Sequence, residues 1–519
     1  MNSTNSMNFG CCTVQRPAVV CLRNEDAEPT IMPRLLSKSK YLTGLQCPKL
    51  LWVEVHEPKR IPAVDAVTQY VFDQGHLVGE YAKKLFPGGI DIEHYDFMGN
   101  IATTRKFLAE RMPLFEAGVL CGNIYSRLDI LDPVDEDEWD IIEIKSGTSA
   151  KQVYIDDVSF QKFCCDKAGL KIRTCRLGFI NNQYVKNGEI EPRELFVLED
   201  VSARVEEAGD GMDERVADLL ESMSKRACPE MGIGQHCLAP YDCPLRAECW
   251  GLLPENSVFD LRGGKTNQFS LYEQGIVSIE DIPDNILLSR QQQIQKECVM
   301  TGNVHVEKGE IRRFLSKLKY PLYYLDFETF GPAIPLYDGT KPYQNIPFQF
   351  SLHIVENDSR EPVHYSFLAD GTGDPRPQLL RELQKLLGPE GSIIAYNSGF
   401  EEGVLVELVE AFPDYTEWLG GIRTRMVDLL YPFTNFHYYN ALQKDTASLK
   451  KVLPAITGKS YEGMDIGAGM DASFAYGRIV CGDATEEEIP KIRADLLKYC
   501  QLDTEGMIWI VARLRALSA

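Results

Sequence analysis

Two acidic residues stand inside an apolar stretch, where carboxylates are costly. The segment "LYYLDFETF" at 322–330 has the composition of a buried strand, and it contains Asp326 and Glu328. Side chains alternate between the two faces of a strand, so these carboxylates are expected to point the same way. Burying one unpaired carboxylate costs several kcal/mol, and a divalent cation with oxygen ligands would offset that cost. The pair therefore predicts a metal site.

Further acidic residues occur where they would reach the same site. The segment "IIAYNSGFEEG" is predicted to pass from a strand through a turn into a helix, which places Asn397 and Glu401 near a strand end. On the predicted last helix, Tyr499 and Asp503 are four residues apart and share one face. Converging carboxylates repel one another unless cations neutralise them. Two divalent ions about 4 Å apart can clamp the attacking and leaving oxygens of a phosphodiester.

These motifs resemble those of the DEDD exonucleases of the DnaQ-like, ribonuclease-H-fold superfamily. The match is Asp-x-Glu on the first strand, Asn-x-x-Phe-acid in the second motif, and the Tyr-x-x-x-Asp of the DEDDy branch. The resemblance implies a 3′→5′ exonuclease in which Tyr499 orients the attacking water and Asn397 shapes the site or contacts substrate. Family members usually have Asp at the position of Glu401, and Glu402 is an alternative for that role. The implied ligands of two Mg²⁺ or Mn²⁺ ions are Asp326, Glu328, Glu401 and Asp503.

A second group of charged residues lies in "YSRLDILDPVDEDEWDIIEIKSG" at 125–147. Asp129 is expected on one strand, and Glu143 and Lys145 are expected on one face of the returning strand. Two carboxylates bind a divalent metal, and a neighbouring Lys can position water and stabilise developing phosphate charge. A cross-strand salt bridge is the alternative explanation.

This second group resembles the RecB-like branch of the PD-(D/E)XK nucleases. The resemblance implies that Asp129 and Glu143 are metal ligands and that Lys145 is catalytic. It also places Gln161, in the following helix "DDVSFQKFCCDKAGLKI", near the substrate. RecB-like enzymes usually carry Gly-x-x-x-His-x-x-x-Glu on an upstream helix. The chain lacks that His, and the nearby His76 is left out of the predicted metal ligands.

Cysteines flank this region on both sides. Cys47 lies upstream, and Cys237, Cys243 and Cys249 follow with five residues between neighbours. One Cys before the core and three after it resembles the RecB-like nucleases that hold a four-iron four-sulfur cluster. Thiolates suit either an iron–sulfur cluster or Zn²⁺, so zinc is the alternative, and Cys228 is an alternative ligand. Such a site would couple metal binding to folding.

The composition is that of a globular protein with an acidic balance. The 519 residues are 44% hydrophobic, and 54 Lys and Arg against 76 Asp and Glu give a net charge of −22. This charge opposes polyanions, so a nucleic-acid partner would be held by local basic patches or through metal ions. No stretch approaches the roughly 20 apolar residues that cross a bilayer, so no membrane partner is expected. With 15 cysteines and no signal peptide, a cytoplasmic location with reduced thiols is expected.

The order of predicted elements divides the chain into four parts and predicts an α/β multidomain protein. Residues 1–31 are expected to be a disordered arm or an artefact of the start site. Residues 36–250 are predicted to form the RecB-like PD-(D/E)XK domain, of restriction-endonuclease type, with its Cys cluster. Residues 251–318 are a predicted helical linker, in which "LYEQGIVSIEDIPDNI" resembles a helix-hairpin-helix, with packing as its alternative role. Residues 319–519 are the predicted ribonuclease-H-like domain.

Together these features resemble a bacterial family of formally unknown function that combines a RecB-like nuclease, a Cys cluster and a DnaQ-like exonuclease. The resemblance implies metal-dependent hydrolysis of nucleic acid at two separate sites, with DNA favoured over RNA. A first alternative is that only one half is active. A nucleic-acid-binding or assembly module without turnover is a second, and a structural protein stapled by zinc is a third.

Overall fold

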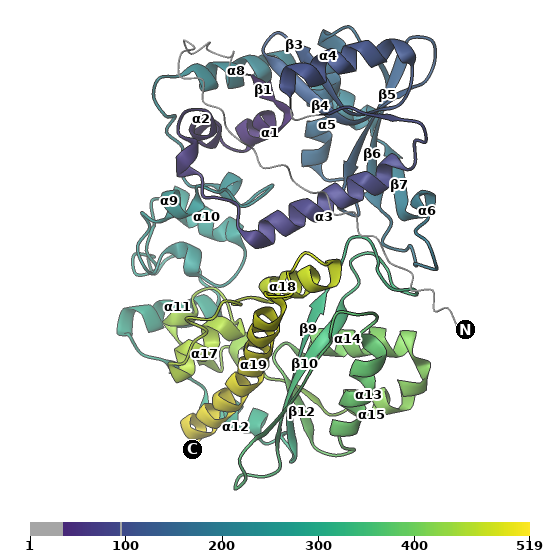
Figure 1. Cartoon of the computed structure of the whole chain (residues 1–519). Helices are drawn as coiled ribbons and strands as arrows, with labels where there is room; N and C mark the ends of the chain where they lie inside the picture. Colours follow the sequence, from purple (N-terminus) through teal and green to yellow (C-terminus); the bar gives the residue numbers. More distant parts are fainter. Residues whose placement is uncertain (1–34, 94–95) are drawn as a thin grey trace, which may run out of the picture.

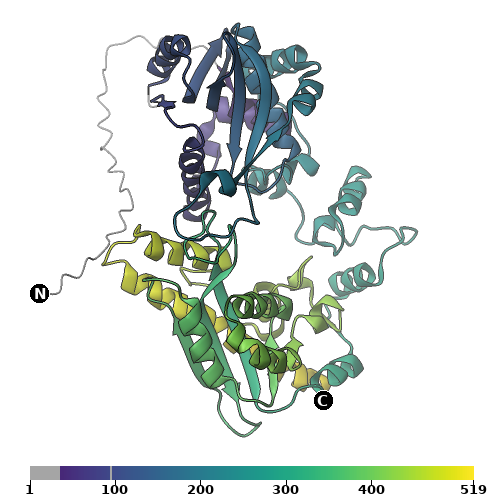
Figure 2. The ribbon, with the colours of Figure 1, turned by 90° about the vertical axis from the view of Figure 1, so that its right-hand side faces the viewer.

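The computed structural model describes residues 35–93 and 96–519, so the predicted arm at 1–31 lies outside the described residues. Within them, two large mixed sheets, each with its own helices, form an α/β protein of more than one domain (Figure 1). The two sheets lie one above the other, and the segment between them in the sequence projects to one side (Figure 2). No helix in the described ranges is both apolar and long enough to span a membrane.

The N-terminal sheet has the order β2-β3-β4-β5-β6-β7, with β1 paired to β4. β3, β4 and β5 form an antiparallel meander, after which helix α5 crosses over to β6, which runs parallel to β5. The strands are β1 (Leu36–Ser37), β2 (Ile90–Asp91), β3 (Leu114–Cys121), β4 (Ile124–Pro133), β5 (Glu138–Lys145), β6 (Lys171–Ile180) and β7 (Phe196–Asp200). The helices of this half are α1 (Lys38–Gln46), α2 (Pro48–His56), α3 (Ala66–Lys83), α4 (Phe97–Phe107), α5 (Gln152–Lys167), α6 (Pro192–Leu195), α7 (Ser202–Gly209) and α8 (Met212–Ser224).

Helix α5 lies between the sheet and helix α1. Its Ile155 and Val158 are buried in the core of the sheet, where Leu128 of β4 also lies. Its Phe160 stacks on Tyr41 of α1, with ring centroids 4.6 Å apart. This packing brings Lys38, the first residue of α1, close to Asp129 of β4 and Glu143 of β5.

The connecting segment contains α9 (Arg246–Trp250), α10 (Lys265–Glu273) and α11 (Arg290–Thr301). The second helix expected after Gly275 is not formed, because residues 276–289 consist of turns and an isolated bridge from Ser257 to Ser278. Ile279 and Ile282 are instead buried in a small core with Phe259 and other residues of the segment. The helix-hairpin-helix expectation is therefore wrong, since apolar side chains of this turn-rich segment anchor it by packing.

The C-terminal sheet has the order β11-β10-β9-β12-β13. β9, β10 and β11 are antiparallel, whereas β12 and β13 run parallel to β9. Its strands are β9 (Leu322–Phe330), β10 (Ile346–Val355), β11 (Val363–Leu368), β12 (Ser392–Ala395) and β13 (Met426–Asp428), and a separate pair is β8 (His305–Val306) with β14 (Tyr438–Tyr439). The helices are α12 (Lys308–Leu315), α13 (Arg376–Leu386), α14 (Ser398–Ala411), α15 (Thr416–Arg423), α16 (Tyr431–Thr434), α17 (Leu449–Thr457), α18 (Gly469–Cys481) and α19 (Ile489–Ser518).

The two faces of β9 contact different helices. Leu325 belongs to a core that includes residues of α13 and α14. Tyr324, on the opposite face, belongs to a core that includes residues of α12, α17 and α19. Asp326 and Glu328 continue the series of Tyr324 at a spacing of two residues, so they lie on the face toward α19, in agreement with the strand alternation.

The loop 331–345, between β9 and β10, reaches into the N-terminal half of the chain. Ala333 and Ile334 are buried in a cluster whose other members come from α3 and from β6 to β7. Asp338 Oδ1 lies 2.6 Å from Lys186 Nζ, and the hydroxyl of Tyr343 donates a hydrogen bond to the carbonyl of Ser146. The loop that follows the strand of Asp326 therefore contacts Ser146, the residue after Lys145.

Candidate active sites

The four carboxylates predicted in the C-terminal half converge. Asp326 and Glu328 come from β9, Glu401 from the first turn of α14, and Asp503 from the middle of α19. Glu328, Glu401 and Asp503 are 6%, 2% and 6% exposed, and Asp326 is half-buried. Tyr499, one turn before Asp503, is also buried. The structure thus brings together residues from three elements that are up to 177 positions apart in the sequence.

Burial and mutual repulsion dominate the electrostatics of this cluster. Burial raises the pKa of Asp326 well above its usual value, and the neighbouring carboxylates of Asp503, Glu328 and Glu401 raise it further. Burial and the same kind of repulsion raise the pKa of Glu328 well above its usual value, while Lys450 opposes the shift. The pKa of Glu401 rises to about 8 and that of Asp503 to about 6, again chiefly through burial. Raised carboxyl pKa values of this kind are expected where the nearby positive charge does not balance the negative charge of the carboxylates.

The neighbouring acid Glu402 does not compete with Glu401. Its Oε1 lies 2.5 Å from Arg423 Nε, so it forms an ion pair on α15 instead. Asn397, predicted to contact substrate, is exposed at the start of α14 with φ of +71°. Its backbone N–H donates a 2.9 Å hydrogen bond to Asp428 Oδ1, which makes Asp428 a support for this turn.

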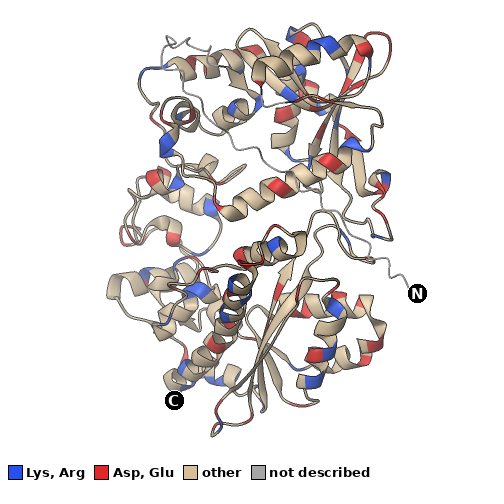
Figure 3. Cartoon of the chain, viewed as in Figure 1, with Lys and Arg blue, Asp and Glu red and all other residues tan. Residues whose placement is uncertain are grey.

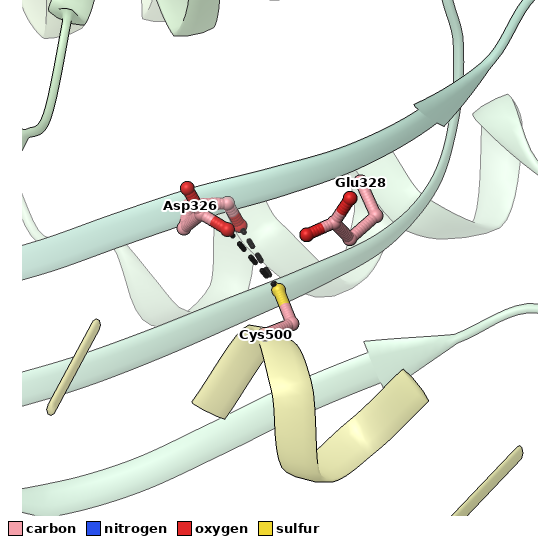
Figure 4. A group of neighbouring side chains, drawn as sticks. All are labelled: Asp326, Glu328 and Cys500. Carbon is pink, nitrogen blue, oxygen red and sulfur yellow. Dashed lines mark hydrogen bonds between the residues drawn. The ribbon is translucent and has the colours of Figure 1, made fainter. Parts of the chain in front are cut away.

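Three further residues enter the C-terminal site that the motifs did not indicate. The hydroxyl of Tyr461 donates a hydrogen bond to Asp503 Oδ1. Lys450 Nζ lies 5.1 Å from the centre of the Tyr499 ring. The thiol of Cys500 lies 3.4 Å from Asp326 Oδ2, and Glu328 points toward the same space (Figure 4). Cys500 lies three residues before Asp503 on α19, so helical spacing alone could have placed it on the face of the predicted ligand Asp503.

The donor atoms of the C-terminal site fit hard divalent cations. Glu401 Oε2 is buried and has no hydrogen-bond partner, an arrangement that is costly unless a further group binds there. The other donors are carboxylate oxygens, which are the ligands that Mg²⁺ and Mn²⁺ prefer. Asp326, Glu328, Glu401 and Asp503 together would therefore hold the predicted ions.

We expect the stability of the metal-free protein to fall as pH rises from about 6.5 to 8.5. A carboxyl whose pKa is raised in the folded state, such as Glu401 with a pKa of about 8, stabilises the fold while protonated and loses that contribution as pH rises through this pKa. Thermal unfolding in chelator should show the decline, and saturating Mg²⁺ should raise the unfolding temperature more at pH 8.5 than at pH 6.5. Glu401→Gln should flatten the decline. A metal-free stability that is constant over this range would contradict the prediction.

The N-terminal site is assembled from β4, β5 and α5. Asp129 lies on β4, and its Oδ2 accepts the backbone N–H of Ile144 at 2.9 Å. Glu143 and Lys145 lie on β5, with Lys145 Nζ 2.7 Å from Glu143 Oε1. Gln161 of α5 is fully buried, and its Nε2 donates to Glu143 Oε2 at 2.7 Å. All four predicted residues therefore meet at one place.

Two additional residues complete the N-terminal site. Asp157 Oδ2 lies 2.7 Å from Lys145 Nζ. Lys38, at the first position of α1, places its Nζ 3.0 Å from Glu143 Oε1 and 3.5 Å from Asp129 Oδ1. Asp157 lies four residues before Gln161 on α5, so helical spacing from the predicted Gln161 could have indicated it. Lys38 has no local signal, because it reaches the site only through the packing of α1 on α5.

The two candidate sites differ in how their negative charge is balanced. Burial alone would lower the pKa of Lys145, but Glu143, Asp157 and Asp129 raise it well above its usual value. The pKa of Lys38 is likewise raised by Glu143 and Asp129 against the effect of burial. Both lysines are thus charged and compensate most of the charge of the three carboxylates. The ammonium of Lys38 lies where a divalent ion held by Asp129 and Glu143, as predicted, would have to displace it.

The four predicted cysteines line one pocket, together with Lys49, His236 and Arg246 among others. Cys47, between α1 and α2, Cys237 and Cys243 are buried, and Cys249 on α9 is half-buried. Burial raises the pKa of Cys243 to about 11, and the other three thiols contribute to the shift. Lys49 Nζ lies 3.2 Å from Cys249 Sγ and would partly offset thiolate charge. Cys228 packs against this group without lining the pocket.

The donor atoms of this pocket are thiols, which suit an iron–sulfur cluster as well as Zn²⁺. A tetrahedral zinc with Zn–S bonds of about 2.3 Å holds its sulfurs about 3.8 Å apart. Among the described residues, no three of the four Sγ atoms lie within 4.8 Å of one another. Cys47, Cys237, Cys243 and Cys249 would be the ligands of the predicted four-iron four-sulfur cluster, or of Zn²⁺ as its alternative.

Replacing Cys243 by Ser is expected to remove bound metal and lower the unfolding temperature by about 5 °C or more, because metal binding here joins distant parts of the chain. Anaerobically purified protein would be compared by iron and zinc analysis, visible absorption and thermal unfolding. Cys121→Ser, a half-exposed cysteine outside the pocket, is the control. Equal metal content and equal stability in Cys243→Ser would exclude a metal in this pocket. Zinc without visible absorption in the wild type would exclude the iron–sulfur cluster.

Comparison with known proteins covers part of the C-terminal half. A search of curated proteins finds no match. Residues 323–448 match the model of a protein family described as Domain of unknown function (DUF2779). The matched segment includes Asp326, Glu328 and Glu401, whereas Tyr499 and Asp503 lie beyond it. Over residues 323–448 the chain is therefore similar to the DUF2779 family.

Proposed function

We propose that this protein is a metal-dependent nuclease that hydrolyses phosphodiester bonds of nucleic acid, with DNA favoured over RNA. Its C-terminal half would contain a two-metal 3′→5′ exonuclease site, and its N-terminal half a second, RecB-like site. The observation that carries the proposal is the convergence of Asp326, Glu328, Glu401 and Asp503, in which Asp503 and Glu401 raise the pKa values of Asp326 and Glu328. Such a cluster is unfavourable in a folded protein unless cations bind to it.

The sheet topologies support the two finer fold assignments. In the C-terminal half, three antiparallel strands followed by two strands parallel to β9 match the order of a ribonuclease-H-like sheet. In the N-terminal half, the meander β3 to β5, the crossover helix α5 and the parallel strand β6 match the core of PD-(D/E)XK nucleases. In both halves the candidate residues lie on the strands and helices at the centre of these cores.

Within the C-terminal site, bound divalent ions would supply neutralisation of phosphate charge and activation of water. Tyr499 is buried one turn before Asp503 on α19, beside the carboxylates, so it is placed to orient the attacking water. Tyr461 fixes the carboxylate of Asp503 from the other side. Lys450 would attract the scissile phosphate toward the four carboxylates.

Within the N-terminal site, Lys145 would stabilise the negative charge that develops on the phosphate. Asp157 and Glu143 hold its ammonium at 2.7 Å each, which fixes its position. Gln161 hydrogen-bonds both of these carboxylates and orients them. Lys38 offers a second cation at the same place.

Basic residues on α19 and beside it support a nucleic-acid partner despite the net charge of −22, and Figure 3 shows Lys and Arg positions along this helix. Lys498 and Arg513 are exposed on α19. Lys459 Nζ lies 3.2 Å from the ring centre of Trp509, which is four residues before Arg513 on the same helical face. Glu505 interrupts this strip. Local cations of this kind can contact backbone phosphates without regard to sequence.

The test is degradation of end-labelled single-stranded DNA and RNA by anaerobically purified protein with Mg²⁺ or Mn²⁺. Wild type would be compared with Asp326→Ala, Lys145→Ala and the double variant. Cleavage that falls in one single variant and disappears in the double variant would assign a substrate and a polarity to each site. Cleavage that depends on one of the two residues alone would support a single active half. No metal-dependent cleavage of either substrate by the wild type would overturn the proposal in favour of a binding module.

A further inference from the structure

Cys500 places a sulfur atom inside a group of carboxylate ligands. One ligand atom each from Asp326, Glu328 and Cys500 lies within 4.8 Å of the other two (Figure 4). The thiol is fully buried on α19, and its Sγ is 3.4 Å from Asp326 Oδ2. A thiol contributes nothing to a site for Mg²⁺, whose ligands are oxygens.

The geometry of these atoms suits a smaller, more thiophilic ion. With Zn–S of about 2.3 Å and Zn–O of about 2.1 Å, a tetrahedral zinc sets its sulfur and oxygen ligands about 3.6 Å apart. The Sγ–Oδ2 distance of 3.4 Å is close to this value. A second observation from the same group of carboxylates points to a bound ion, because Glu401 Oε2 is buried without a hydrogen-bond partner beside Asp326 and Glu328, whose pKa values it raises.

We propose that Asp326, Glu328 and Cys500 form an inhibitory site for thiophilic divalent cations, with Zn²⁺ as the natural ligand class and Cd²⁺ as its probe. This inference rests on the proposed exonuclease function, since it describes the regulation of that site. On binding, the S–H bond of Cys500 breaks, a sulfur–metal bond forms, and the proton leaves to solvent without any change of oxidation state. Asp326 and Glu328 are then engaged by this ion and no longer hold the ions that support cleavage.

The physical reason for inhibition is ligand preference. Thiolate binds Zn²⁺ and Cd²⁺ in preference to Mg²⁺ or Mn²⁺, whereas carboxylates bind all four ions. A thiophilic ion therefore gains one strong ligand at this site that the catalytic ions cannot use. Raising Mg²⁺ would weaken its binding, because the two kinds of ion compete for the same oxygens.

The first experiment measures binding and needs no activity. Cd²⁺ would be titrated anaerobically into wild type, Cys500→Ser and the control Cys298→Ser, while the ultraviolet absorption of the thiolate–cadmium bond is recorded. Cys298 is buried in a separate cluster beside Phe436 and Tyr439. Cys298→Ser should match the wild type, and Cys500→Ser should lack the contribution of one thiolate. The four-cysteine pocket contributes equally to all three proteins and cancels in the differences.

Two further measurements make the result specific. Asp326→Asn, which keeps the thiol, should require about tenfold more Cd²⁺ for the same absorption, because a ligand of the group is lost. In nuclease assays at fixed Mg²⁺, the Zn²⁺ concentration for half inhibition should be at least about tenfold higher in Cys500→Ser than in wild type. Equal Cd²⁺ absorption in wild type and Cys500→Ser would overturn the inference even if the nuclease is active. A wild type without nuclease activity that still shows the Cys500 signal would overturn the proposed function and leave the metal site standing.

Discussion

Replacing Asp326 by Asn is expected to lower Mg²⁺-dependent 3′→5′ turnover at the C-terminal site by about 10³-fold or more. Asn is nearly isosteric with Asp but carries no charge, so it would bind a divalent ion weakly. Asp326 is central, since it contacts the thiol of Cys500 and its pKa responds to Asp503, Glu328 and Glu401. Single-turnover digestion of 3′-labelled DNA would measure the chemical step separately from product release.

The same substitution should stabilise the protein when metal is absent. Removing one of four converging carboxylates relieves repulsion, so Asp326→Asn should unfold at a higher temperature than the wild type in chelator. In saturating Mg²⁺ the order should reverse, because the wild type gains more from the ions. Asp414→Asn, an exposed acid of the same half, is the matched control and should change neither property. Loss of activity together with loss of stability in chelator would instead indicate a structural role for Asp326.

Replacing Lys145 by Gln is expected to lower cleavage at the N-terminal site by about 10²- to 10³-fold, because charge stabilisation of the phosphate is lost. The effect is best measured in an Asp326→Asn background, where the C-terminal site does not obscure it. Glu143 keeps Lys38 and Gln161 as partners, and Asp157 keeps Gln161, so the fold should persist. Thermal unfolding would check this.

Lys151→Gln is the control for this substitution. Lys151 is exposed at the start of α5, close in sequence to Lys145 but outside the group of carboxylates. Cleavage by the double variant Asp326→Asn, Lys145→Gln at the rate of Asp326→Asn alone would contradict the prediction. The ion pairs of Lys145 would then serve folding, as a cross-strand salt bridge would.

Local patterns in the sequence predicted those parts of the sites that depend on regular elements. The alternation of β9 placed Asp326 and Glu328 on one face, and the helical spacing did the same for Tyr499 and Asp503. Each of these predictions required only the spacing at which side chains recur on one face of a strand or helix. The apolar residues around each motif indicate which of the two spacings applies. The grouping of the four cysteines did not follow from such a spacing; it was predicted from the resemblance to RecB-like nucleases, and the structure places all four around one pocket.

Tertiary packing decided what the patterns did not predict. Lys38 is 105 positions from Glu143, and it arrives there because Tyr41 stacks on Phe160. Tyr461 lies in a segment without regular structure, where no period relates it to Asp503. The segment after Gly275 has a helix-like composition, but its isoleucines are buried from turns. In each case the deciding contact joins residues that no strand or helix period relates.

The loop 331–345 has a consequence for the energetics of the whole chain. Ala333 and Ile334 are 1% and 4% exposed because the N-terminal half covers them, so separating the halves would expose apolar surface on both. Unfolding either half would therefore also cost the free energy of exposing this interface. For that reason the two halves should melt together rather than one after the other. Divalent ions that bind at Asp326 would then raise the melting temperature of the N-terminal half as well, although they do not touch it.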